Sequence, residues 1–166
     1  MSWSAAEVSA LGTKAARGAG APPAQAARFG QVVSLHLMTG RDATDLSAAL
    51  DALPAGPILD HPLTLDRAMI AAEKGEAAEL VDVPFDALLQ SYVEALPFAA
   101  EVVRAGPDRL IFRCDLAAPR VPPVLKRICG CDALITQMEC LAACTLVPES
   151  DLSRLSGAGA GLTDND

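Results

Sequence analysis

The sequence predicts an α+β fold, a helix-rich single domain with a small sheet that is at least partly antiparallel. Apolar residues recur at helical spacing through most of the chain, whereas alternating apolar and polar residues are confined to short segments. Two of these, 98–103 and 109–116, flank a turn-rich pentapeptide, as in a β-hairpin. Hydrophobic residues make up 51% of the 166 residues, enough for one buried core. We expect residues 1–149 to form this domain and residues 150–166 to form a Gly-rich acidic segment.

The first helix is expected to begin at Ser4 and to run to about Arg17. Ser4 and Glu7 have the spacing of a capping box, in which each side chain accepts the other residue's backbone amide. Gly18 or Gly20 ends the helix, because glycine adopts the left-handed conformation that follows many helices.

Two further helices follow in the sequence. The second begins at Pro22-Pro23, where a missing amide costs nothing, and ends at Gly40. Asp42 is expected to cap the third, which runs through Leu53 and stops at Pro54.

The central part is predicted to alternate between helix and extended chain. Residues 57–62 contain two prolines and are expected to be extended or turn-like. A helical stripe covers 65–72, and 80–83 is a short strand candidate. Asp86 is a plausible cap for a helix over 88–96.

Burial selects a register for the hairpin that follows. Placing Val102 opposite Leu110 aligns Ala100 with Phe112 and puts the apolar side chains on one face. After the hairpin, Asp132 is expected to cap a long final helix that Pro148 limits.

Charge and hydropathy exclude several classes of function. The net charge is −8 and is spread evenly along the chain, so we expect no nucleic acid partner, because such partners require clustered Lys and Arg. No signal peptide and no membrane-spanning run is visible, so we expect no membrane association and a cytoplasmic location. The five cysteines are expected to be reduced thiols.

Neither the cysteines nor the histidines form an established site in the sequence. Four cysteines lie within sixteen residues, but their C-x-C half departs from zinc-site spacing, so we expect no metal and no other cofactor. His36 is expected to be a partly buried helix residue, and His61 lies in a predicted turn where Asp60 could orient its ring. No nucleophile motif accompanies either histidine. The four clustered cysteines are Cys129, Cys131, Cys140 and Cys144.

Basic residues gather locally in 104–127. An exposed hairpin face with Arg109 and Arg113 could bind a carboxylate or a phosphate. The alternative is a solvated face balanced by Glu101 and Asp115, which we favour because surface charge pairs contribute little. The remaining basic residues are Arg104, Arg120, Lys126 and Arg127.

The C-terminal segment is the most unusual in composition. Its alternating glycines let successive amides point into one concavity, as in an anion-binding nest, whereas a flexible solvated terminus has the same composition. The candidate ligand residues are Ser150, Ser153, Arg154, Gly157, Gly159 and Gly161, with Asp164 and Asp166 for a cation or a cationic partner.

Two terminal motifs are similar to those of an uncharacterised bacterial protein family, a domain of unknown function. They are the heptapeptide K-A-A-R-G-A-G at 14–20 and the run V-P-E-S-D-L-S-R at 147–154 followed by G-A-G-A-G-L-T-D-N-D at 157–166. The resemblance implies a class of protein but no activity. It also makes a functional C-terminal segment as good an interpretation as a flexible solvated one.

Two functional interpretations remain open from the sequence. In the first, the C-terminal segment binds a small anionic molecule, with help from Lys14 and Arg17 on the first helix. In the second, the chain is a non-catalytic accessory protein, and this segment docks on an enzyme partner. No paired carboxylates and no histidine base are evident, so the sequence assigns neither a reaction nor an oligomeric state.

Overall fold

The computed structural model describes residues 1–72, 77–84, 86–107, 109–121, 123–124 and 126–145. Within them, the chain forms helices and two antiparallel sheets, which confirms the α+β prediction. The helices are α1 (Ala5–Gly18), α2 (Pro23–Met38), α3 (Ala43–Asp51), α4 (Pro57–Ala72), α5 (Ala87–Glu94) and α6 (Asp132–Ala143). The strands are β1 (Ser2–Trp3), β2 (Ala78–Val81), β3 (Phe98–Arg104), β4 (Arg109–Pro119) and β5 (Ile128–Cys129).

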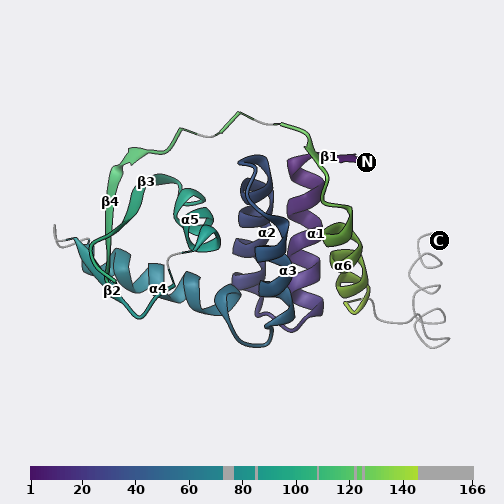
Figure 1. The fold of residues 1–166 in the computed structure, drawn as a ribbon, viewed down its shortest axis with the longest axis horizontal. Helices are drawn as coiled ribbons and strands as arrows, with labels where there is room; N and C mark the ends of the chain where they lie inside the picture. Colours follow the sequence, from purple (N-terminus) through teal and green to yellow (C-terminus); the bar gives the residue numbers. More distant parts are fainter. Residues whose placement is uncertain (73–76, 85, 108, 122, 125, 146–166) are drawn as a thin grey trace, which may run out of the picture.

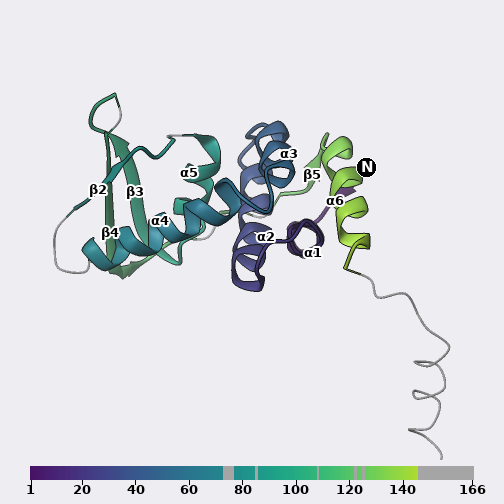
Figure 2. The same ribbon diagram turned by 90° about the horizontal axis from the view of Figure 1, so that it is seen from below.

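Helix α2 lies between two groups of elements (Figure 1). On one side are α1 and α6, together with the short β1–β5 pair, and α3 lies alongside α2 and contacts α4, α5 and α6. On the other side are α5 and the three-stranded sheet, whose order is β2-β4-β3. Helix α4 runs from the sheet toward α2 and α3 (Figure 2). One core joins both groups, because Phe29, Leu65 and Phe112 are all fully buried within the same cluster.

Two glycines allow the helices around α1 to approach closely. A Cβ atom at Gly30 of α2 would overlap the side chain of Thr13 and the carbonyl of Ser9 on α1. A Cβ atom at Gly18 would overlap the carbonyl of Leu141 on α6. Gly18 lies in the heptapeptide that resembles a family motif, and the structure gives it a packing role.

Local capping predictions are confirmed for three helices. Ser4 and Glu7 form both bonds of the capping box of α1. The Asp42 carboxylate accepts the Thr44 amide of α3, and the Asp86 carboxylate accepts the Leu89 amide of α5. The prediction for α6 is wrong. Cys131 is its N-cap and makes no side-chain cap bond, and Asp132 is the first helical residue, where its charge still favours the positive helix end.

The extended segment predicted over 57–62 is wrong. Helix α4 begins at Pro57, where the fixed φ of proline suits a first helical residue, and Pro62 lies inside the helix. An interior proline removes one backbone hydrogen bond and costs about 3 kcal/mol. Ile58 and Leu65 are fully buried on the same helix, and burying such a side chain contributes about 1.5–3 kcal/mol. Burial of this face therefore offsets the cost of the proline.

The β3–β4 hairpin is confirmed, but its predicted register is wrong by two residues. Val102 pairs with Phe112 instead of Leu110, and Arg104 pairs with Leu110. Ala105 and Gly106 donate to the Arg109 carbonyl, so the turn is shorter than the predicted five-residue loop. A shift of two preserves the alternation of faces, which is why burial alone could not select the register. Strand β2 lies two residues earlier than predicted, and β1 and β5 were not predicted.

Candidate functional site

A groove of about 680 Å³ lies between α2, the turn from α5 to β3 and the β4–β5 connection. We call it the α2 groove. Apolar side chains form most of its wall, and four polar residues interrupt them, a combination typical of small-molecule sites. The apolar residues are Ala5, Leu35, Met38, Ala95, Leu96, Pro97 and Pro123, and the polar ones are Gln31, Ser34, Glu94 and Arg120.

A smaller cavity of about 250 Å³ adjoins the α2 groove and shares Gln31, Ala95, Leu96 and Pro97 with it. Tyr92 lies on its wall and is 2% exposed. The buried Tyr92 hydroxyl has no hydrogen-bond partner among the described residues. Burial also raises the pKa of Tyr92 well above its usual range, so the hydroxyl keeps its proton. An unpaired donor is thus present on a residue of the smaller cavity's wall.

Arg120 is the cationic residue in the wall of the α2 groove. Its guanidinium is partly buried and donates to the carbonyls of Val93, at 3.3 Å, and Ala100, at 2.7 Å. Val93 lies in the last turn of α5, so Arg120 also meets the negative end of that helix. Its Nε atom is buried without a hydrogen-bond partner, and no described carboxylate lies within ion-pair distance. The charge of Arg120 is therefore only partly compensated.

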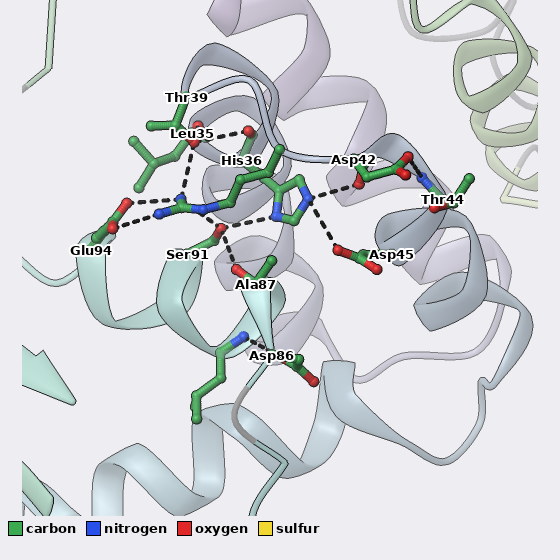
Figure 3. A network of polar contacts seen from close by, with 12 residues as sticks. Leu35, His36, Thr39, Asp42, Thr44, Asp45, Asp86, Ala87, Ser91 and Glu94 are labelled. Carbon is green, nitrogen blue, oxygen red and sulfur yellow. Dashed lines mark hydrogen bonds and ion pairs between the residues drawn. The ribbon is translucent and has the colours of Figure 1, made fainter. Parts of the chain in front are cut away.

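A polar network behind the groove holds α5 against α2 (Figure 3). Arg41 makes a two-bond ion pair with Glu94, at 2.8 and 2.6 Å, and also donates to the Ser91 hydroxyl at 3.0 Å. Ser91 Oγ lies 2.9 Å from His36 Nδ1, and His36 Nε2 lies 2.9 Å from the Asp42 carbonyl. Because Arg41 neutralises Glu94, the acidic residue of the groove wall does not cancel the charge of Arg120.

The partners of His36 determine its tautomer. A carbonyl oxygen can only accept, so Nε2 carries the hydrogen that is donated to Asp42. Burial lowers the pKa of His36, although the Asp42 carbonyl and the Asp45 carboxylate oppose this shift. The ring is therefore neutral near pH 7, and Nδ1 is an acceptor. The Ser91 hydroxyl has one hydrogen, which it can donate either to Nδ1 or to the Ala87 carbonyl, each 2.9 Å away.

The Ser91–His36 pair has the composition of a hydrolase dyad but not its accessibility. Both residues are fully buried, so no substrate carbonyl can reach the Ser91 oxygen. The Ser91 hydroxyl also lies 2.9 Å from the Ala87 carbonyl of its own helix and accepts from Arg41. The network therefore positions α5, and a substrate cannot reach the Ser91–His36 pair.

His61 lies in α4 and not in a turn, and its nearest carboxylate is Asp86 instead of Asp60. Nε2 of this 3% exposed ring is 3.5 Å from Asp86 Oδ2 and makes no hydrogen bond to any described residue. The ring packs edge-on against Tyr92 with centroids 5.8 Å apart. Both His61 and Asp86 line a second cavity, of about 530 Å³. The sequence separation of 25 residues concealed this pair.

The arginines of the hairpin face are each paired with a glutamate. Arg113 lies 3.4 Å from Glu101, and Arg109 pairs with Glu79 of β2. Glu101 is one of the two balancing residues in the alternative that we favoured, whereas Glu79 takes the place expected for Asp115. Arg120, which we had grouped with these residues, lies apart in the α2 groove.

The five cysteines are all free thiols in the structure. Cys131 is buried, while Cys129, Cys140 and Cys144 are exposed. Among the described residues, no group of three or more His, Cys, Asp or Glu side chains could hold a metal ion.

The structure describes only two of the residues predicted to bind a ligand. Lys14 and Arg17 are exposed on α1, and Arg17 donates to the Ala21 carbonyl at 2.9 Å. The others lie outside the described residues, so the site in the C-terminal segment stays a prediction. They are Ser150, Ser153, Arg154, Gly157, Gly159, Gly161, Asp164 and Asp166.

No protein-family model, curated protein or solved structure matches this chain. The resemblance of its terminal motifs to an uncharacterised family therefore stays a prediction. Of the described helices, none is both long and apolar enough to span a membrane.

Proposed function

We propose that this protein binds a small amphipathic anion in the α2 groove. The observation that carries the proposal is Arg120, a partly buried guanidinium without a described carboxylate partner in a mostly apolar wall. A charge that is only partly compensated in such a place is costly, and a ligand carboxylate or phosphate would complete its compensation. The apolar part of the ligand would lie along Leu35, Met38 and Leu96.

This proposal keeps the ligand class expected from the sequence but places the site in the α2 groove. A role for the C-terminal segment remains a separate proposal. We further propose that the chain works in the cytoplasm, because five free thiols fit a reducing compartment. The negative net charge supports a small molecule or a protein as partner instead of nucleic acid.

Decanoate below its micellar concentration is a suitable probe of the α2 groove. At ten times its Kd it would stabilise the fold by about 1.4 kcal/mol, which raises the melting temperature of a chain this size by about 3–5 °C. Decanol should give a smaller shift, because Arg120 selects the negative head group. Arg120→Gln should remove the preference for decanoate, and Arg113→Gln, which changes a paired arginine outside the groove, should not.

A second variant tests the apolar wall independently of Arg120. Met38→Glu introduces a carboxylate into the groove and should abolish the response to decanoate. If decanoate gives no shift in the wild type, or if decanol and decanoate give equal shifts in the wild type and in Arg120→Gln, the proposed anion site is wrong.

A further inference from the structure

The second cavity, which we call the α4 cavity, has the opposite electrostatic character. Its wall contains three carboxylates, Asp60, Asp82 and Asp86, against one guanidinium, that of Arg67. The cavity is formed by one face of α4 and by the chain between β2 and α5. Its volume of about 530 Å³ is within the usual range for small-molecule sites.

A second observation makes this acidic cavity a candidate site. His61 lines it with a ring that is 97% removed from solvent, and its buried Nε2 has no hydrogen-bond partner. Asp86 Oδ2 lies 3.5 Å from that nitrogen, beyond a good hydrogen bond but within reach of a small movement. Asp86 Oδ1 already accepts the Leu89 amide, so Oδ2, beside the ring, is the oxygen that a ligand cation in the cavity can bind.

The walls of the cavity also include apolar side chains that are unusually exposed. Leu63 is 44% exposed and Val81 is 58% exposed, and both line the cavity. Large aliphatic side chains beside carboxylates suit a ligand that carries both an alkyl chain and a positive charge. Among the described residues, no three His, Cys, Asp or Glu side chains lie close enough together to hold a metal ion, so these carboxylates do not form a metal site.

We infer that the α4 cavity binds an alkyl diammonium molecule, with one charged group at Asp60 and Asp86, its alkyl chain against Leu63 and Val81, and its second charged group at Asp82. His61 acts as a positioning residue for the Asp86 carboxylate. This inference does not depend on the α2 groove, because the two cavities share no lining residue.

Cadaverine (1,5-diaminopentane) is the probe for this site, at constant ionic strength. It should raise the melting temperature of the wild type by about 3–5 °C at ten times its Kd, whereas 1,5-pentanediol should not. Asp86→Asn removes the charge but keeps a side chain that caps α5 well, and it should lose most of the shift. Asp60→Asn should weaken the response in the same direction, and Asp115→Asn, outside the cavity, should leave it unchanged.

The two histidines provide a direct readout of the location. In imidazole nitrogen NMR spectra, cadaverine should move the Nε2 signal of His61 and leave His36 unchanged, because His36 lies in the separate network behind the groove. The inference is overturned if cadaverine gives no shift in melting temperature at concentrations up to about 10 mM. A Kd above that concentration would be too weak for a specific site. Equal shifts in Asp86→Asn, Asp60→Asn and Asp115→Asn, or movement of both histidine signals, would also overturn it.

Discussion

Replacing Ser91 by alanine tests whether the network of Figure 3 holds α5 in place. The substitution removes the hydroxyl that His36 Nδ1 and Arg41 both use, and His36 is fully buried. A buried polar group left without a partner costs about 1–3 kcal/mol. The higher helix propensity of alanine returns about 0.5 kcal/mol. We therefore expect the free energy of unfolding to fall by about 0.5–2.5 kcal/mol.

Ser34→Ala is the matched control for this experiment. Ser34 is 8% exposed and also lies in a helix, but its hydroxyl donates to the Gln31 carbonyl of the same helix. We expect the unfolding free energy of this variant to stay within about 0.5 kcal/mol of the wild type. Urea unfolding with unchanged m-values measures both changes. If the two variants lose equal stability, the network does not position His36 and α5, and our tautomer assignment is wrong.

Two further predictions concern packing and pH. Gly30→Ala should destabilise the fold by about 1–2 kcal/mol, because overlap with Thr13 outweighs the gain of about 1 kcal/mol in helix propensity. Gly12→Ala, whose Cβ would lie 3.2 Å from a methyl of Val33, should be neutral or stabilising in the same thermal melts. Burial lowers the pKa of His36 in the folded chain, so the unfolded chain binds the proton more readily. The stability contributed by the neutral His36 ring is therefore complete above about pH 6.5 and is lost as the pH falls below that value. Urea unfolding between pH 7 and pH 5 should show a weaker pH dependence in His36→Gln, and an equal dependence would contradict the neutral buried ring.

Capping could be predicted from the sequence for three helices because it depends on residues two or three positions apart. The Ser4 capping box and the caps at Asp42 and Asp86 needed no knowledge of the rest of the chain. The position of Pro62 inside a helix could not be predicted in this way, because propensities of neighbouring residues account only for the backbone hydrogen bond that proline lacks. Burial of Ile58 and Leu65 against other elements decides that segment.

The candidate sites were missed because distant segments form them. The α2 groove brings Leu35 of α2 beside Leu96 and Arg120, which are far apart in the sequence. No periodicity or motif marks such a meeting. The one available signal was Asp86, which the sequence identified as a cap but not as the neighbour of His61.

Helix α5 connects the two proposed sites, and this gives the Ser91 variant a second use. The Asp86 cap at its beginning lines the α4 cavity, and the Val93 carbonyl at its end accepts from Arg120 in the α2 groove. A helix of eight residues is too short to be stable alone, so its position depends on contacts such as those of Ser91. Ser91→Ala changes these contacts without altering a charge in either site. If the responses to decanoate and cadaverine depend on charge, Ser91→Ala should keep both of them at temperatures where it is folded. Arg120→Gln should lose only the response to decanoate, and Asp86→Asn should lose only the response to cadaverine.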